Sequence, residues 1–161
     1  MSHPEPAISS SPLSRSRASE VGYTGSRARE ERWRFGESRV RGVGTDLVDV
    51  NRLARSLRRR NGFAETVFCS DELRFCHSQR SPEHHFAARF AAKEAFLKAL
   101  GLGVFSGIAL TDIEVVRDHD GAPRLRLGPT AAAALARVGG KAALLSMSHQ
   151  RRVALAVVVV P

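Results

Sequence analysis

The sequence predicts an α+β fold in which a largely antiparallel sheet packs with a long helix. Two observations lead to this prediction. Residues 48–101 carry apolar residues at helical spacing, whereas residues 110–160 carry short β-branched or alternating segments, with one helical segment between them. Strands that follow one another through tight turns pair antiparallel, so this order disfavours a doubly wound parallel sheet.

The composition is that of one globular domain. The chain has 161 residues, of which 43% are hydrophobic and 25% charged. The longest apolar run, Val153–Val160, has the length and β-branching of a strand, so no membrane span is expected. Cys69 and Cys76 are the two cysteines, and no apolar leader follows Met1. We therefore expect a protein of the reducing cytoplasm without a disulfide framework.

Residues 1–38 differ from the rest of the chain. They are rich in Ser, Arg, Glu, Pro and Gly without a sustained period, so we expect a disordered tail before a folded domain at 39–161. A transit peptide is an alternative, although five glutamates disfavour it. A further alternative is that translation starts near Val40, in which case the tail would not be made. The net charge of the chain is +9, and nearly all of it lies after residue 38, so the domain attracts anionic partners.

The first half predicts a strand followed by helices. Residues 40–46 predict a short strand that runs into a turn, and residues 48–60 predict a helix with one apolar face. The opposite face of that helix carries Arg52, Arg55 and Arg59. Ser70 is the expected cap of another helix, with acidic residues in its first turn. Residues 81–101 predict the longest helix, which should end at Gly101.

The second half predicts mainly strands. Residues 110–118 and 124–128 flank the turn DHDGAP and predict a hairpin. Residues 129–139 predict a helix that begins at a proline and ends at a glycine. Residues 143–149 and 153–160 predict two more strands around a basic turn.

Asp46 is the first candidate for chemistry. It follows a glycine and a threonine at the expected end of the first strand. Asp46 or Asp49 could cap the next helix, which is the commonest role of such an aspartate. Alternatively, Asp46 binds a hard cation together with a second carboxylate, as Mg²⁺ sites often require.

Glu94 and Lys98 form a second candidate. They are i,i+4 neighbours in the longest helix, and this spacing alone predicts a solvated surface pair. The small residues Ala87 and Ala91 lie beside them and would allow a ligand or another backbone to come close. Periodicity alone favours the solvated surface pair.

Residues 146–152, SMSHQRR, combine hydroxyl, imidazole and guanidinium groups, which together suit an anion. We expect Ser146, Ser148 and His149 on or near one side of a strand. The alternative is the polar outer face of an edge strand. Other chemistries have less support: the cysteines and histidines lack zinc-site spacing, and no G-x-S-x-G motif is present. Nucleic-acid binding lacks aromatic stacking motifs, since only 6% of residues are aromatic.

Four segments carry a family resemblance. They are VGTDLVDVNRL (43–53), RFAAKEAFLKALGLG (89–103), TDIEVVRDHDGAPRLRL (111–127) and LLSMSHQRRVALAVVVV (144–160). In this order they resemble the holo-acyl-carrier-protein synthases, the small bacterial class of 4′-phosphopantetheinyl transferases. The combination of RFAAKEA with an upstream GTD and a downstream SMSH is specific, and the resemblance covers residues 40–160.

The resemblance implies a reaction and a site. A serine hydroxyl of an acyl carrier protein attacks the β-phosphate of coenzyme A, takes up 4′-phosphopantetheine and releases adenosine 3′,5′-bisphosphate. The magnesium ligands of the family fall on Asp46 and Glu94. Glu94 acting through a metal-bound water is the first candidate for the general base, and His149 is the alternative. Coenzyme A contacts are implied for Arg89, Lys98, Gly101, Gly103, Ser148 and His149.

The resemblance also implies partners. Acyl carrier proteins are acidic, so Arg52, Arg55 and Arg59 are expected to dock the carrier. Members of the family are typically homotrimers with active sites between subunits. Whether the carrier serves fatty-acid or polyketide synthesis is left open. Two other functions remain alternatives: a non-catalytic carrier-binding module, which the intact Asp46, Glu94 and Lys98 disfavour, and a basic nucleic-acid-binding module.

Overall fold

The computed structural model describes residues 40–59, 61–103 and 106–161. The predicted tail at 1–38 lies outside the described residues. Within them the elements follow the predicted order of strand, helices, hairpin, helix and two strands. None of the described helices is long and apolar enough to cross a membrane.

The strands form two antiparallel sheets. The larger sheet has the order β1-β5-β4 and consists of β1 (Gly42–Asp49), β4 (Leu144–Gln150) and β5 (Val153–Val160). The valine-rich β5 is central, and every pair is antiparallel. The smaller sheet is the hairpin of β2 (Ile113–Arg117) and β3 (Pro123–Leu127). The predicted α+β class is confirmed, with the strands divided between two sheets.

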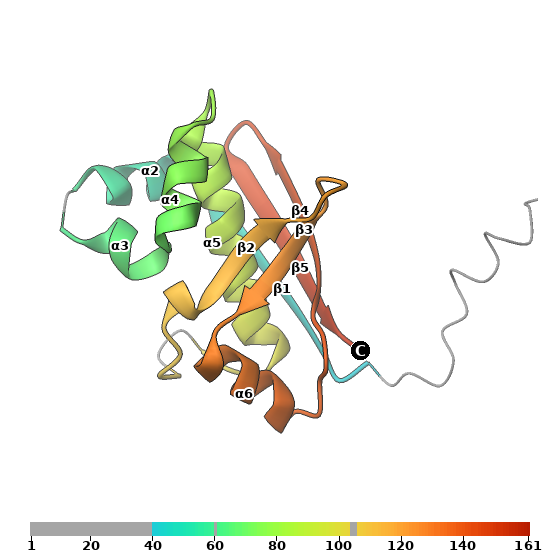
Figure 1. Cartoon of the computed structure of the whole chain (residues 1–161). Helices are drawn as coiled ribbons and strands as arrows, with labels where there is room; N and C mark the ends of the chain where they lie inside the picture. Colours follow the sequence, from blue (N-terminus) through green and yellow to red (C-terminus); the bar gives the residue numbers. More distant parts are fainter. Residues whose placement is uncertain (1–39, 60, 104–105) are drawn as a thin grey trace, which may run out of the picture. The chain divides into compact units, whose positions relative to one another are not determined.

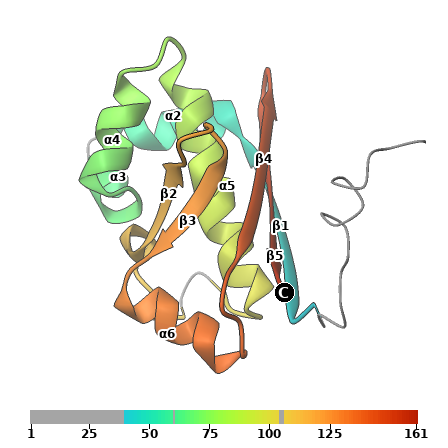
Figure 2. The same ribbon diagram turned by 45° about the vertical axis from the view of Figure 1, so that its right-hand side comes forward.

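The longest helix, α5 (Pro82–Ala99), lies between the two sheets (Figure 2). Helices α2 (Val50–Arg58), α3 (Phe63–Val67) and α4 (Ser70–His77) gather at one end of the fold, and α6 (Pro129–Arg137) lies at the other (Figure 1). A short 3₁₀ turn, η2 (Leu110–Asp112), leads into β2. As predicted, α5 has a proline in its first turn and is followed by Gly101 at φ 70°.

Helix α5 is buried on nearly every side. From Phe86 to Leu100 only Lys98 is exposed and Phe90 is half-buried. The interpretation of Glu94 as a solvated surface residue is therefore wrong. The helix has no polar face because a sheet covers it on each side, and its alanines keep both sheets close.

Where the first half of β1 meets α5, main chain packs directly on main chain. A Cβ added at Gly44 would overlap the carbonyl oxygen of Ala95, and one added at Gly42 would overlap that of Ala99. The two glycines therefore let the strand lie directly on the helix backbone. This approach brings the Asp46 and Glu94 segments together.

Two boundaries differ from the predicted ones. β1 continues through Asp49, so Asp46 lies within the strand and not at its end. Asp49 caps α2 by accepting a hydrogen bond from the Arg52 backbone N–H at 2.7 Å. The cap of α4 is Cys69 and not Ser70, and the Glu72 side chain accepts from the Cys69 N–H at 3.2 Å. The short helix α3 was not predicted.

The larger sheet has one covered and one open face. Residues on its inner face, such as Ala154, Ala156 and Val158, are fully buried against α5. The outer face carries large apolar side chains that remain exposed, for example Leu47 at 64%. No described helix covers this face (Figure 2). Its exposed apolar residues are Val43, Leu47, Leu144, Val153 and Leu155.

Candidate active site

Asp46 and Lys98 form an ion pair between β1 and the end of α5. Lys98 Nζ donates to Asp46 Oδ1 at 2.8 Å and to the Thr45 carbonyl oxygen at 3.1 Å. Within the described chain, this is the ion pair that Lys98 makes, in place of the expected i,i+4 pair with Glu94. Half of the Lys98 side chain is exposed, so its ammonium group can also face a ligand.

Glu94 points toward the same place from α5. It is only 8% exposed, and its Oε1 is buried without a hydrogen-bond partner among the described residues. Burial raises the pKa of the Glu94 carboxyl, and the Asp46 carboxylate raises it further, whereas Lys98 opposes the change. Glu94 is therefore a buried carboxylate next to a second one, with a cation as the favourable partner for both.

A cavity of about 550 Å³ opens over the two carboxylates. It lies between β1, α2, α3 and α5. Asp46 and Glu94 form its acidic part, and Phe63 and Phe90 form an apolar wall. The cavity extends to the carboxylate of Asp49 and to Arg52 of α2. The expected metal ligands therefore share a cavity with the first of the expected carrier-docking arginines.

Arg89 lies on another side of α5. It is 3% exposed, and its guanidinium group stacks over the Phe75 ring at 4.1 Å. Burial lowers the pKa of Arg89, and burial raises the pKa of the neighbouring Cys76 thiol to about 11. Arg117 of β2 stacks on the same Phe75 ring at 5.1 Å. The structure thus places Arg89 away from Glu94, as their spacing in the helix predicts.

His149 belongs to this second group. It projects from the inner face of β4, and its ring packs against His84 at 5.4 Å and His85 at 5.7 Å between centroids. Burial lowers the pKa of His85, and nearby Arg89 and His149 lower it further. Asp46 and His149 lie on opposite edge strands of the sheet, about 10 Å apart across its width. Helix α5 separates them.

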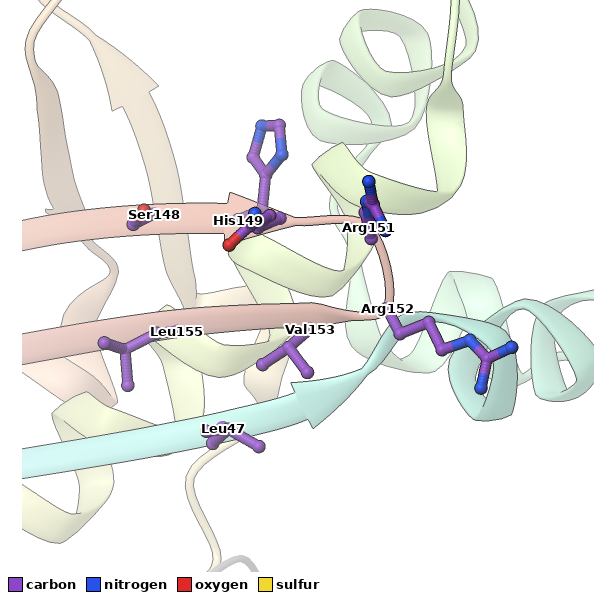
Figure 3. A pocket seen from close by; sticks show the side chains of 8 residues that line it. Leu47, Ser148, His149, Arg151, Arg152, Val153 and Leu155 are labelled. Atoms are coloured by element: carbon purple, nitrogen blue, oxygen red, sulfur yellow. The ribbon is translucent and has the colours of Figure 1, made fainter.

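Ser146 and Ser148 lie on the outer face of the sheet, opposite to His149. The expectation that all three share one side is wrong, because consecutive strand residues alternate between faces. A shallow cavity of about 680 Å³ adjoins Ser148 and the β4–β5 turn. Figure 3 shows Leu47, Val153 and Leu155 pointing to one side of the sheet, whereas His149 and Arg151 point to the other. The cavity is apolar at its floor and basic at its rim.

The remaining predicted residues are exposed. Gly101 and Gly103 follow α5, and an added Cβ would meet nothing at either position. Their role at a ligand stays a prediction. Arg52, Arg55 and Arg59 are exposed along and just after α2, while Val50, Leu53 and Ala54 are buried, so the predicted two faces of this helix are present.

Sequence reasoning missed two polar groups near the site. Lys93 and Glu72 form a buried ion pair at 2.6 Å on the side of α5 that faces α4. The available signals were a lysine inside an apolar stretch and a glutamate at the third position of a helix. His84 and His85 were also missed as neighbours of His149.

Comparison with known proteins places this geometry in a family. The model of the 4′-phosphopantetheinyl transferase superfamily matches residues 42–158, which include both carboxylates and His149. The chain belongs to that superfamily. The match covers both sheets and α5, so the predicted resemblance is confirmed. The chain is accordingly an enzyme of the holo-acyl-carrier-protein synthase type.

Individual relatives agree with this assignment. The holo-[acyl-carrier-protein] synthase of Syntrophus aciditrophicus is 45% identical over 121 residues, which are 74% of this chain and 94% of the relative. The crystal structure of the synthase from Neisseria meningitidis matches with a TM-score of 0.69 and 33% identity, and the match covers 76% of this chain and 98% of that one. The Helicobacter pylori synthase in complex with coenzyme A matches with a TM-score of 0.65 and 28% identity, over 74% and 99% of the chains.

The carboxylates of this transferase fit a divalent cation. The buried Glu94 Oε1, which has no described partner, and the nearby Asp46 present two oxygen ligands, which is what Mg²⁺ takes from protein when phosphates supply others. No group of three or more His, Cys, Asp or Glu residues in the described chain could hold a metal ion by itself. Any cation at Asp46 and Glu94 would therefore share its coordination with water or a ligand.

We expect Glu94→Gln to stabilise the protein without divalent ions at neutral pH, by on the order of 1 kcal/mol. The raised pKa of Glu94 means that the folded state holds its proton more tightly than the unfolded chain. Ionised Glu94 therefore costs stability above its folded pKa, and this cost disappears in acid. Thermal unfolding in EDTA, near neutral pH and in acid, measures the difference. Mg²⁺ should raise the melting temperature of wild type but not of the variant. Equal melting temperatures of wild type and variant in EDTA at neutral pH, in EDTA in acid and with Mg²⁺ would contradict the assignment of Glu94 as a cation ligand.

Proposed function

We propose that the chain transfers 4′-phosphopantetheine from coenzyme A to a serine of an apo-acyl carrier protein, with Mg²⁺ as cofactor and adenosine 3′,5′-bisphosphate as the second product. The observation that carries the proposal is the pairing of Asp46 with the buried Glu94 in one cavity. The relatives named holo-[acyl-carrier-protein] synthase, one of them in complex with coenzyme A, support the carrier protein and coenzyme A as substrates. Both cysteines are free thiols, which suits the cytoplasm.

Glu94 is the proposed base. The serine oxygen of the carrier attacks the β-phosphorus, and the bond from this phosphorus to the oxygen bridging toward the adenosine side breaks. The serine proton passes through a water molecule to Glu94. The raised pKa of Glu94 belongs to the metal-free chain, and a cation beside it would lower that pKa, so the proposed role as base rests on the position of Glu94 in the cavity with Asp46. A base of this kind removes the proton as the new phosphodiester bond forms.

Asp46 and Lys98 are proposed to help neutralise the negative charge of the coenzyme A pyrophosphate. Asp46 and Glu94 would together hold Mg²⁺, which when bound neutralises the pyrophosphate as the bond breaks. Lys98 is fixed beside them by Asp46 and the Thr45 carbonyl, with half of its side chain exposed. Its ammonium group can therefore approach a phosphate oxygen of coenzyme A at the mouth of the cavity.

The basic group around Arg89 and His149 would bind the remaining phosphate of coenzyme A. In one chain this group and the carboxylates lie on different sides of α5, so a single small ligand does not reach both directly. A neighbouring copy that brings its own Arg89 and His149 to the Asp46 side would complete the site. When each subunit uses one surface to bind a different surface of the next, the subunits form a closed ring if the rotation between neighbours divides a full turn.

We therefore propose a homotrimer with active sites between subunits, assembled through the outer face of the larger sheet. That face supplies the apolar side chains expected at a stable interface, running from Val43 on β1 to Leu144 on β4. Gly101, Gly103 and Ser148 are the further proposed contacts to coenzyme A.

The carrier is proposed to dock on α2. Arg52, Arg55 and Arg59 are exposed, and Arg52 lines the cavity of the two carboxylates. An acidic helix bound to this surface would place its serine near Glu94. The arginines thus link recognition of the carrier to the reacting groups.

The transfer itself is tested with apo-carrier protein, coenzyme A and Mg²⁺, with mass spectrometry of the carrier as the readout. We expect addition of the phosphopantetheine arm by wild type. Asp46→Ala and Glu94→Ala should each slow transfer by about two orders of magnitude or more while the fold is retained, because each removes a ligand of the cation. An unmodified carrier across several candidates would exclude the proposed reaction. Full activity of either variant would exclude its metal role.

Charge reversal on α2 should act on the carrier alone. For Arg52→Glu/Arg55→Glu we expect the KM for the carrier to rise about tenfold, equivalent to about 1.4 kcal/mol, because attraction to an acidic helix becomes repulsion. The KM for coenzyme A should stay unchanged. Arg137→Glu, on the distant helix α6, serves as the matched control. Steady-state kinetics with an equal carrier KM in both variants would argue against docking on α2.

Sedimentation equilibrium tests the assembly. Wild type should sediment with the mass of three chains. Leu144→Asp, which places a charge on the outer sheet face, should dissociate it and lower transfer. Ala142→Asp introduces the same charge at an exposed position before β4 and should leave the mass unchanged. A monomeric wild type that is fully active would refute the shared site.

A further inference from the structure

A fully buried ion pair lies one residue from Glu94. Lys93 Nζ contacts Glu72 Oε2 at 2.6 Å, and the two side chains are 0% and 1% exposed. Burial lowers the pKa of Lys93, and Glu72 opposes this change. Neither residue lines the cavity of the two carboxylates, so the proposed reaction does not use them directly.

The pair joins α5 to three other elements by directed hydrogen bonds. Lys93 Nζ also donates to the Leu110 carbonyl oxygen of η2 at 2.9 Å. Glu72 Oε1 accepts from the Val115 N–H of β2 at 3.0 Å. Glu72 Oε2 accepts from the Cys69 N–H at the start of α4 at 3.2 Å. Both carboxylate oxygens and the ammonium group are therefore satisfied inside the protein.

Stability alone does not account for such a pair. Two charges lose their hydration when they are buried, and apolar residues of similar volume often replace a buried pair without loss of stability. Apolar residues, however, do not fix the angle at which two elements meet, because their contacts are not directional. The two hydrogen bonds of Lys93 fix both a distance and an angle between α5 and its neighbours α4 and η2, and the Glu72 bond to Val115 holds α4 on β2.

Direction matters because the other side of α5 provides less of it. At Gly42 and Gly44 the backbone of β1 lies directly on the helix backbone. The directed side-chain contacts to β1 come from the half-exposed Lys98, which bonds Asp46 and the Thr45 carbonyl near the end of the helix. Close backbone packing of this kind sets the spacing of the two elements more firmly than the rotation of the helix about its axis. Lys93 and Glu94 are adjacent and therefore project about 100° apart. Whatever fixes the direction of Lys93 also fixes that of Glu94.

We propose that Lys93 and Glu72 are positioning residues that set the rotation of α5, so that Glu94 faces Asp46 and the two carboxylates bind one divalent cation. The pair acts through Glu94 and does not touch the substrates. The catalytic part of this proposal rests on the proposed transfer reaction, whereas the effect on cation binding is independent of it.

The test replaces the pair by neutral groups of similar shape, Glu72→Gln/Lys93→Met, and measures Mn²⁺ binding by electron paramagnetic resonance without carrier or coenzyme A. Transfer kinetics and thermal unfolding are measured alongside. We expect Mn²⁺ affinity and kcat each to fall about tenfold, as for other residues that orient metal ligands, with the carrier KM unchanged.

The matched control is Leu135→Ala in α6, which removes buried core away from α5. It should lower the melting temperature and keep the Mn²⁺ affinity of wild type, which separates positioning from a general loss of stability.

A folded double variant with the Mn²⁺ affinity and kcat of wild type would overturn the positioning role. If that variant does not fold, Glu72→Asp replaces it, since this change keeps the charge but draws the carboxylate back by one methylene group. A partial fall in Mn²⁺ affinity would support positioning, and no change would overturn it. A wild-type protein that binds Mn²⁺ but modifies no carrier would refute the proposed function and not the role of the pair. A wild type that binds no Mn²⁺ would refute the pair's role.

Discussion

The enclosure of α5 between two sheets is the constraint on which the rest of the structure depends. Because the helix is covered on both sides, its small residues determine how closely the strands approach, and Gly42 and Gly44 bring β1 onto its backbone. Asp46 and Glu94 meet as a result of this approach. The same enclosure leaves the second basic group, around Arg89 and His149, on another flank of the helix.

Enclosure also gives the acidic residues their chemistry. A carboxylate on a solvated helix would ionise freely and bind a cation weakly. Burial of Glu94 next to Asp46 makes ionisation costly, as the raised pKa of Glu94 indicates, and a bound cation would offset that cost. The protein therefore accepts a less stable metal-free state at this position, which is a common arrangement at sites selected for function.

Much of the fold was predictable from local signals. The hairpin, the two C-terminal strands and both ends of α5 follow from turn residues, β-branched runs and a proline and glycine at the helix ends. Burial of Glu94 was not predictable from periodicity, because a helix covered by two sheets has no polar face and its charged residues resemble a solvated surface. The strand position of Asp46 was missed because glycine and threonine suggested a turn. The pairing of Lys93 with Glu72 depends on tertiary contacts that no local pattern encodes.

Assembly through the open outer face of the larger sheet would make the activity of the protein depend on its concentration. If copies associate through that face and share the coenzyme A site as proposed, dilution separates chains that are each incomplete. The active fraction would then grow more steeply than the total amount of protein at low expression. The rate of carrier modification would then depend on gene dosage with a threshold. Halving the amount of enzyme would lower this rate by more than half.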